Sequence, residues 1–332
     1  MIIISLFTKI LHYLPGELSH SIALRSLKFL NSSGLMKLFR ITKTYDFSER
    51  DIRNRTNMVG IAAGLDKNGD YIDCLSSLGI GFIEVGTVTP KPQEGNPKPR
   101  IFRNKKDKSL LNRLGFNNKG VDYLVEKLKE RKSEIIVGSS IGKNFDTPND
   151  KAYEDYIHCL KKVYQFSDYI AVNISSPNTK DLRRLSNQDF FDYLLKKLKD
   201  SRSELSVKFG YRPIFIKISP DESPENLKLM CQLIVSNEMD GIICSNTTVK
   251  HKEEFGSGGL SGTPLRIISN QILTFVKDEV GKDFPIIASG GVMSVKDYKE
   301  KLTLGADLVQ IYTGFIYEGP KLIQDIIKHS SD

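Results

Sequence analysis

The chain has little of what marks metal-binding, disulfide-bonded or membrane-spanning proteins. Its four cysteines are scattered with no CxxC pair, which favours small core residues in a reducing compartment; they are Cys74, Cys159, Cys231 and Cys244. The five histidines form no HExxH or paired cluster, so we expect no metal site. Met1 to Thr8 is apolar, but Lys9 ends this run far short of the roughly 20 residues that span a bilayer. The run also lacks the basic start and small-residue cleavage site of a secretory signal.

The chain also lacks the features of a nucleic-acid-binding protein, although its net charge is +8. Its lysines occur in short runs without interleaved aromatic residues, and solvated faces explain such runs better than a nucleic-acid groove does. We find no low-complexity linker and no internal repeat. With 332 residues, of which 39% are hydrophobic and 27% charged, the composition is that of a soluble globular protein. That length suits one barrel of about 250 residues with insertions.

The first 45 residues differ from the rest and form one predicted domain, followed by a second at 46–332. Residues 2–14 and 17–30 are expected to be short helices, broken at Pro15-Gly16. Up to Lys43 the segment has one acid, Glu17, against six basic residues: Lys9, Arg25, Lys28, Lys37, Arg40 and Lys43. This composition suits a helical pair lying on an anionic membrane. The alternative, a helical cap packed on the barrel, remains open.

Beyond residue 57, apolar and β-branched runs alternate with helical periodicity. The runs are Met58–Ala63, Gly81–Val88, Ile135–Ile141, Tyr169–Ile174, Pro213–Ile218, Gly241–Cys244, Pro285–Ala288 and Asp307–Tyr312. Helical segments are predicted at 150–166, 188–203, 224–237 and 294–304. This alternation favours a closed parallel (β/α)8 TIM barrel, an α/β fold with a small N-terminal two-helix extension. Residues 91–112, rich in proline and charge, are expected to form an inserted hairpin or cover.

Polar and glycine residues gather where the predicted strands end, which is where barrels carry their chemistry. The segment Asn173–Thr179 offers two amides and three hydroxyls around a proline bend, although such residues also make ordinary loops. Gly290-Gly291 and Gly314 would let backbone N–H groups approach a phosphate, with Gly258–Gly262 adding donors from a preceding loop. Lys67 and Lys217 are candidate cations at the same mouth.

Several of these stretches resemble one family across nearly the whole chain, and they occur in that family's order. They are Ala62–Lys67, Gly86–Pro90, Asn112–Asn117, Ile141–Asn144, Asn173–Thr179, Asn246–Thr248, Gly258–Gly262 and Gln310–Gly314. The chain resembles the dihydroorotate dehydrogenases, and the two-helix extension together with Ser176 resembles their membrane-associated, quinone-reducing class. The soluble classes usually have cysteine in place of Ser176.

The resemblance implies roles for individual residues. Ser176 would be the catalytic base, with Thr179 and Phe116 in a proton relay and residues 178–184 as a lid. Dihydroorotate would be held by Lys67, Asn112, Arg113, Leu114, Gly115, Phe116, Asn173, Asn178, Asn246 and Thr247. FMN would be held by Ala63, Gly64, Leu65, Asp66, Lys67, Thr87, Ser140, Asn173, Lys217, Ser245, Gly262, Gly291, Tyr312 and Thr313. A quinone tunnel would be lined by His20, Arg103 and Tyr312.

This sequence departs from the family at a few of these positions. Ser140 stands where relatives often have asparagine near the flavin, and Ser245 stands where many have threonine. The segment 248–258 is also shorter than in familiar relatives, which changes the rim of the mouth.

The resemblance implies a flavoenzyme of de novo pyrimidine biosynthesis. It would oxidise dihydroorotate to orotate, taking a proton from C5 and a hydride from C6, and pass the electrons through FMN to a membrane quinone. It implies a peripheral protein on the cytoplasmic face of the cell (inner) membrane, acting as a monomer. Two other readings of the residues stay open: a sugar-phosphate isomerase or aldolase with a Schiff base on Lys217 or Lys67, and a non-catalytic flavoprotein.

Overall fold

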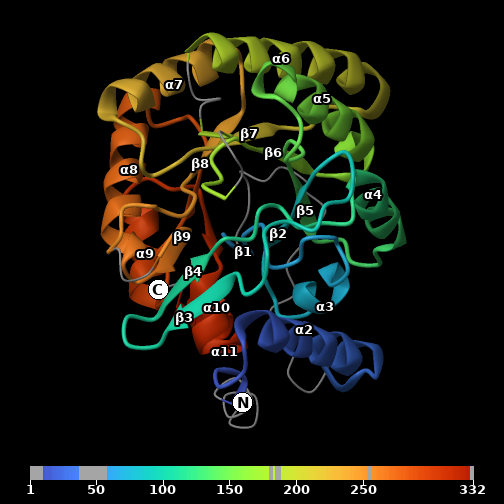
Figure 1. Ribbon diagram of the computed structural model, residues 1–332, viewed down its shortest axis with the longest axis vertical. Coiled ribbons are helices and arrows are strands. Elements are labelled where there is room, and N and C mark those ends of the chain that lie inside the picture. Colours follow the sequence, from blue (N-terminus) through green and yellow to red (C-terminus); the bar gives the residue numbers. More distant parts are fainter. Residues whose placement is uncertain (1–9, 37–57, 179–181, 184–187, 253–255, 330–332) are drawn as a thin grey trace.

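A computed structural model describes residues 10–36, 58–178, 182–183, 188–252 and 256–329. Its centre is a closed barrel of parallel strands in the order β1-β11-β10-β8-β7-β6-β5-β2 (Figure 1). These strands are β1 (Val59–Ile61), β2 (Phe82–Val88), β5 (Ile136–Ile141), β6 (Tyr169–Asn173), β7 (Ile214–Lys217), β8 (Gly241–Cys244), β10 (Ile286–Ser289) and β11 (Leu308–Ile311). Each apolar run of the sequence coincides with one of them. The predicted (β/α)8 barrel is therefore confirmed.

Helices surround this barrel and connect successive strands (Figure 1). They are α3 (Ile72–Ser76), α4 (Val121–Glu130), α5 (Ala152–Val163), α6 (Gln188–Phe209), α7 (Pro224–Ser236), α8 (Leu265–Val280), α9 (Val295–Thr303), α10 (Thr313–Glu318) and α11 (Pro320–His329). Two helices begin with a serine whose hydroxyl accepts a backbone N–H: Ser223 before α7 and Ser294 before α9. The helical periodicity of the sequence therefore located α5, α6, α7 and α9.

Aromatic rings close the barrel at the end where its strands begin. Phe82, Tyr169 and Phe215 lie at the starts of β2, β6 and β7, and each is at most 1% exposed. The Tyr169 ring meets the other two edge-on, with centroids 6.5 Å from Phe82 and 5.6 Å from Phe215. Filled in this way, the barrel offers space for a ligand at the opposite end, where the strands finish.

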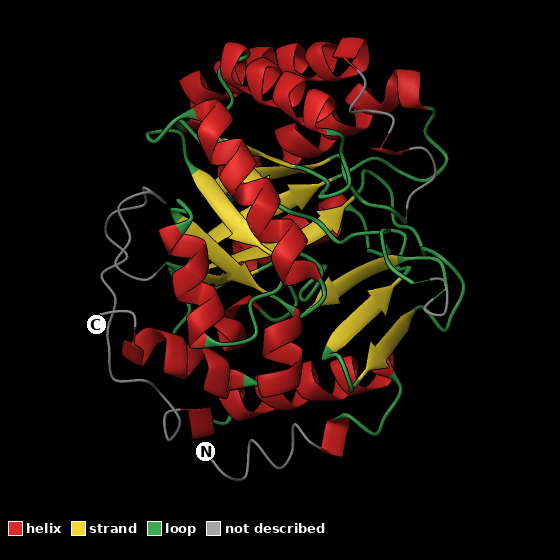
Figure 2. Ribbon diagram, turned by 90° about the vertical axis from the view of Figure 1, so that its left-hand side faces the viewer, coloured by secondary structure: helices red, strands yellow, loops and turns green. Residues whose placement is uncertain are grey.

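A small antiparallel sheet, ordered β3-β4-β9, lies beside the barrel mouth (Figure 2). Its first two strands, β3 (Ile101–Asn104) and β4 (Ser109–Asn112), form the hairpin predicted between residues 91 and 112. The third strand, β9 (Gly259–Gly262), pairs with β4 along its whole length. Residues 259–262 were expected to be a loop, and that expectation is wrong: their glycine-rich composition did not reveal a strand that depends on a distant partner.

The N-terminal helix α2 (Gly16–Ser32) packs outside the barrel next to α3 and β3 (Figures 1 and 2). Pro15 occupies its N-cap, as the predicted break at Pro15-Gly16 requires. Residues 10 and 11 are helical, but residues 12–14 form a turn and a bend, so the helix predicted at 2–14 ends earlier than expected. Residues 2–9 of that prediction lie outside the described residues. Arg103 of β3 holds this region by donating to the carbonyls of Leu11 and Leu14 and to Ser19 Oγ.

Candidate functional site

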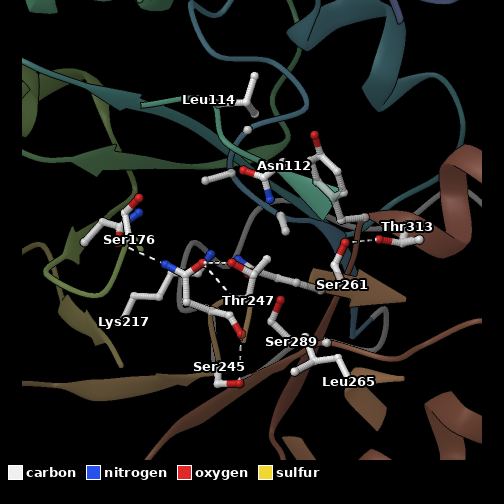
Figure 3. Close-up of a pocket in the computed structure, with 18 of the residues that line it drawn as sticks. Asn112, Leu114, Ser176, Lys217, Ser245, Thr247, Ser261, Leu265, Ser289 and Thr313 are labelled. Atoms are coloured by element: carbon white, nitrogen blue, oxygen red, sulfur yellow. Dashed lines mark hydrogen bonds between the residues drawn. The ribbon is translucent and has the colours of Figure 1, made fainter. Parts of the chain in front are cut away.

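A cavity opens at the carboxyl ends of the barrel strands, beneath the β3-β4-β9 sheet. Its wall comes from the loops after almost every strand (Figure 3). The lining residues that the sequence had singled out are Ala63, Gly64, Lys67, Thr87, Asn112, Leu114, Gly115, Phe116, Asn173, Ser176, Asn178, Lys217, Ser245, Asn246, Thr247, Gly262, Gly291, Tyr312 and Thr313. The fold thus brings together side chains from positions 63 to 313 of the chain.

The floor of the cavity is a buried polar cluster inside the barrel. Lys217 Nζ lies 3.4 Å from Glu84 Oε1, and both side chains are almost fully buried. Glu84 Oε2 accepts a hydrogen bond from Gln310 Nε2 at 2.7 Å and one from the Tyr169 hydroxyl at 3.3 Å. A buried charge pair costs desolvation unless further hydrogen bonds satisfy it, and these neighbours supply them. The cluster holds the Lys217 ammonium at a fixed place under the cavity.

Four asparagines form two hydrogen-bonded pairs in the wall. Asn178 Nδ2 donates to Asn112 Oδ1 at 2.9 Å, and Asn246 Nδ2 donates to Asn173 Oδ1 at 3.2 Å. Asn173 Nδ2 in turn donates to Thr87 Oγ1 at 3.0 Å. Asn246 also donates to Ser175 Oγ, so both of its N–H groups are engaged, and Asn112 donates to the carbonyl of Gly259. Among the described residues, Asn112, Asn173 and Asn178 each keep one N–H for a ligand. This pattern matches a ring with alternating amide N–H and C=O groups.

Ser176 lies in the loop after β6 and is 6% exposed, with its side chain on the cavity wall (Figure 3). Its Oγ accepts a hydrogen bond from the backbone N–H of Asn178 at 3.3 Å. This local turn, typical of a serine ahead of proline and asparagine, fixes where the hydroxyl stands. Within the part of the chain that the structure describes, the hydroxyl proton has no protein acceptor, so it can be donated to another group.

Lys67 carries a positive charge into the cavity from the loop after β1. Its Nζ donates to the carbonyl of Gly64 at 2.9 Å. Burial, together with the nearby positive charge of Arg100, lowers the pKa of Lys67 to about 8, while Glu17 opposes this shift. The ammonium therefore lies close to its titration point near neutral pH, where an anionic ligand would stabilise its charged form.

A chain of hydrogen bonds joins α2 to the loops of the cavity. Glu17 of α2 pairs with the buried Arg100, with Oε1 2.7 Å from Nε. Arg100 donates to the carbonyl of Asn96, whose side-chain amide donates to the carbonyls of Arg113 and Asn178. The helix outside the barrel is thus connected to both loops that carry the Asn112–Asn178 pair.

Glycines shape the wall after β10 and β11. Gly290 and Gly291 have φ values of +108° and +76°, which other residues rarely adopt. A Cβ on Gly291 would lie 2.3 Å from Cα of Arg266, and one on Gly314 would lie 2.2 Å from the carbonyl oxygen of Val292. These loops are packed so closely on α8 and on each other that backbone, rather than side chains, forms this part of the cavity wall.

These residues fit the flavin mononucleotide that the sequence resemblance implies. The glycine backbone after β10 and β11 suits a phosphate, and the buried Lys217 suits an electron-rich ring edge. Gln310 lines the cavity, and its buried Oε1 has no protein partner within the described residues, so a ligand donor can satisfy it. Donors, acceptors and a cation therefore line one continuous surface.

Four expected site residues lie behind the wall instead of on it. Asp66 accepts the backbone N–H groups of Asp70 and Tyr71 at 2.9 and 2.8 Å, which orders the turn into α3. Ser140 Oγ lies 2.9 Å from Thr87 Oγ1, so it touches a lining residue from outside. Leu65 is buried toward α2, and the Arg113 guanidinium stacks on the Phe102 ring.

The structure describes only one of the two residues predicted for the proton relay, Phe116 and Thr179. Phe116 lies on the cavity wall, as expected. Thr179 lies outside the described residues, as does most of the proposed lid at 178–184. Arg183, within that segment, donates to the carbonyls of Ser175 and Thr247 and pairs with Asp221 at 2.8 Å, so it ties the β6 loop to the β8 loop.

Sequence reasoning missed some lining residues, among them Leu265, Val292 and Gln310. Leu265 and Val292 are apolar and cannot be distinguished from core residues by type. Gln310 did carry a signal, since a glutamine in an otherwise apolar strand needs polar neighbours when it is buried. Glu84, in the middle of β2, gave the same signal.

A second cavity lies between α2 and the barrel, with a volume of about 640 Å³. It is mainly apolar, and its wall includes the expected tunnel residues His20, Arg103 and Tyr312. Burial and the charge of Lys67 lower the pKa of His20 to about 3, so its imidazole is neutral at physiological pH. Asn112, Ser261 and Tyr312 line both cavities, and they therefore form the partition between them.

Comparison with known proteins identifies relatives along the whole chain. Residues 52–331 match the family model described as dihydroorotate dehydrogenase. A dihydroorotate dehydrogenase (quinone) of Aliivibrio salmonicida is 44% identical over 95% of this chain and 96% of its own. One of Buchnera aphidicola is also 44% identical, over 98% of both chains. A crystal structure of Eimeria tenella DHODH in complex with ferulenol superposes with a TM-score of 0.80 at 33% identity, covering 95% of this chain and 90% of that one.

Proposed function

The chain belongs to the dihydroorotate dehydrogenase family, and from that premise we propose the chemistry of its two cavities. The protein is an oxidoreductase that converts dihydroorotate to orotate in pyrimidine biosynthesis, with a quinone as electron acceptor. One observation supports the proposal most: the asparagine pairs, Ser176 and Lys67 share a cavity with the glycine loops, and a second, apolar cavity adjoins it.

In the proposed site the asparagines bind the pyrimidine ring and Lys67 binds its carboxylate. Asn112 and Asn178 are proposed to offer a donor and an acceptor each to the ring's amide edges, and Asn173 its second N–H. Asn246, whose N–H groups donate to Asn173 and Ser175, is proposed to offer its oxygen. A site of this kind rejects an analogue that lacks one polar group by about 10⁴-fold, because its own buried groups would be left unpaired. The Lys67 ammonium balances the substrate's negative charge and the charge that develops as the C5 proton leaves.

Ser176 is the proposed base that removes the C5 proton. A neutral serine is a weak base, so its own proton must pass onward as it accepts the new one. The Asn178 N–H bond to Ser176 Oγ supports this role, because it stabilises negative charge growing on that oxygen. Thr179 stays the proposed next carrier of the proton. Phe116, on the cavity wall, is proposed to exclude bulk water from the path.

The proposed cofactor is FMN, within a family that is flavin-dependent in general. When bound, it supplies the acceptor for the hydride from C6. Ala63, Gly64, Thr87, Asn173, Lys217, Ser245, Gly262, Gly291, Tyr312 and Thr313 are proposed to hold it. The contacts of Leu65, Asp66 and Ser140 lead us to propose for them a supporting role behind these residues.

The second cavity is the proposed quinone site, entered from a membrane surface. Large apolar side chains are exposed on this side of the molecule: Ile10, Tyr13, Leu18, Phe29 and Leu35 are each at least 43% exposed. Arg25 and Lys28 add positive charge on α2, and each such residue near an anionic surface contributes about 1 kcal/mol. Among the described residues, every helix is too short or too polar to cross a bilayer.

We therefore propose peripheral attachment through domain 1–45, at the cytoplasmic face, with domain 46–332 carrying the chemistry. The monomeric state stays a prediction. Co-sedimentation with anionic lipid vesicles tests the attachment, which is wrong if the full chain stays in the supernatant.

The decisive experiment is an absorbance spectrum of the purified protein recorded without oxygen, before and after dihydroorotate is added. We expect a yellow protein whose flavin band bleaches on addition and returns when a quinone is supplied. A colourless protein that borohydride inactivates in the presence of a sugar phosphate would support an aldolase instead. Bound flavin that dihydroorotate does not bleach would support a non-catalytic flavoprotein.

The affinity for dihydroorotate is expected to fall as the pH rises above 8. The pKa of Lys67 is about 8, so at higher pH it loses the charge that binds the carboxylate. Well above that pH the dissociation constant should rise about tenfold per unit, since one proton is lost. Titrating the product orotate against the bound flavin at several pH values measures this. The same profile should be flat for Lys67→Met, and a profile unchanged by that substitution contradicts the role.

A further inference from the structure

A buried lysine lies directly behind the glycine loop that follows β10. Lys301 of α9 is 0% exposed, and its Nζ donates to Ser269 Oγ of α8 at 2.7 Å. It does not line either cavity and has no part in the chemistry described above. A fully buried ammonium is costly unless charge and hydrogen bonds compensate for it, so its position requires an explanation.

Ser269 connects this lysine to the loop. Its Oγ lies 3.0 Å from the carbonyl oxygen of Gly290 and 3.0 Å from that of Arg266, and its single proton is shared between them. The Gly290 carbonyl therefore faces α8 and the charged side chain behind it. The loop is pressed against this helix, since a Cβ on Gly290 would lie 2.9 Å from Cδ2 of Leu265.

The direction of that carbonyl fixes the direction of the next amide. In a planar trans peptide the C=O and N–H bonds point to opposite sides, so the N–H of Gly291 points away from Ser269. Gly290 and Gly291 both line the barrel-mouth cavity, and α8 lies on the other side of them. The Gly291 amide is thus presented to the cavity where a phosphate is proposed to bind.

We propose that Lys301 and Ser269 are positioning residues for the cofactor phosphate. Hydrogen bonds in series polarise one another, so an ammonium donating to Ser269, which donates to the Gly290 carbonyl, strengthens Gly291 N–H as a donor. The ammonium also adds a positive charge behind the loop, in a medium that screens it poorly. The inference rests on the proposed function, because it concerns the phosphate of the proposed FMN.

The surrounding charges leave Lys301 open to this role. Asp297 is engaged by Arg266 at 2.6 Å, and the same guanidinium lies 3.9 Å from Glu300. Within the described residues Lys301 has no ion pair of its own. Burial lowers its pKa to about 8, opposed by Cys244, Glu300 and Asp297. A bound phosphate dianion would supply the negative charge that no described residue pairs with Lys301.

The test compares FMN with riboflavin, which lacks the phosphate, on the full chain after its flavin has been removed. For Lys301→Met we expect the FMN dissociation constant to rise about tenfold and that of riboflavin to stay within about twofold. The flavin-free variant should also melt at a higher temperature than the flavin-free wild type, since a buried unpaired charge has gone. Flavin fluorescence and a thermal melt measure these quantities.

Ser269→Ala gives a second route to the same answer and replaces Lys301→Met if that variant fails to fold. It should weaken FMN selectively, and adding Lys301→Met should have less effect in its background than alone. Lys143→Met is the matched control, because Lys143 is 2% exposed but donates to Asn144 and Thr147, away from the glycine loop. Its ratio of FMN to riboflavin affinity should equal that of the wild type.

The outcomes separate this inference from the proposed function. A wild type that binds neither flavin overturns the proposed function itself. A wild type that prefers FMN, with Lys301→Met weakening both flavins equally, overturns the inference and leaves the function in place. If Lys301→Met binds FMN and riboflavin with the affinities of the wild type, the inference is likewise overturned and the proposed function stays in place.

Discussion

Ser176→Ala is expected to leave the flavin bound while slowing its reduction by dihydroorotate about 10²- to 10⁴-fold, the usual contribution of a positioned base. The Ser176 hydroxyl lines the cavity and accepts a hydrogen bond from the Asn178 N–H, and among the described residues it donates none. Its loss should therefore remove proton transfer and leave the binding surfaces intact. Stopped-flow measurement of flavin bleaching without oxygen gives the rate directly.

Ser176→Cys serves as the matched variant for this prediction. A thiol of similar size ionises near pH 8.5 in water, so it should restore part of the rate as the pH rises. Ser175→Ala offers a contrast at the neighbouring position, because the Ser175 hydroxyl bonds to the Lys217 carbonyl at 2.7 Å and supports Asn246. That change should weaken substrate binding more than it slows proton removal. A Ser176→Ala enzyme that is reduced at the wild-type rate would remove the serine from its role.

Deleting residues 1–40 is expected to abolish turnover with a quinone while flavin reduction by dihydroorotate continues. The deletion removes α2, which forms one whole wall of the 640 Å³ cavity. A lipid-soluble quinone would then have no apolar cavity through which to reach the flavin. Steady-state assays with a quinone, paired with anaerobic bleaching, separate the two half-reactions. The deleted protein should also fail to co-sediment with anionic vesicles.

Two point variants show whether this effect comes from the cavity or from damage to the barrel. Ala23→Phe places a ring in the cavity from α2, and it should raise the KM for the quinone without slowing flavin reduction. Glu17→Gln removes the charge that pairs with Arg100 while keeping the helix. This variant tests separately how losing the Glu17 charge changes the pKa of Lys67, an effect that the deletion also has. Normal quinone turnover in the deleted protein would show that the second cavity is not the quinone site.

Much of the fold was predictable because individual residue types indicate which segments are buried and which backbone conformation they adopt. β-branched residues crowd into the barrel strands, such as Ile214–Lys217, and the observed strand bounds lie close to the predicted ones. The sheet beside the mouth was only half predictable. Its hairpin is local, so prolines and charges between residues 91 and 112 revealed it. Strand β9 depends on β4, about 150 positions earlier in the chain, and no local signal encodes that pairing.

The site was predictable by loop but less so by side chain. The loops that the motifs named line one cavity, and Ser176, Asn112 and Asn246 are among its lining residues. Direction within a loop depends on turns that the sequence does not specify, which is why Asp66 caps the following turn and Arg113 stacks outside. Gln310 and Lys301 illustrate the other gap, since a polar residue among apolar ones signals a partner without identifying it.

The contact between Glu17 and Arg100 limits how the two halves of this protein can be exchanged. A chimaera that takes α2 from a relative inherits whatever residue that relative has opposite Arg100. If that residue is neutral, the arginine's charge weighs more heavily on Lys67, and the foreign helix would alter orotate affinity without touching orotate. A change in α2 that suits another quinone would therefore also alter the charge near Lys67, the proposed carboxylate ligand.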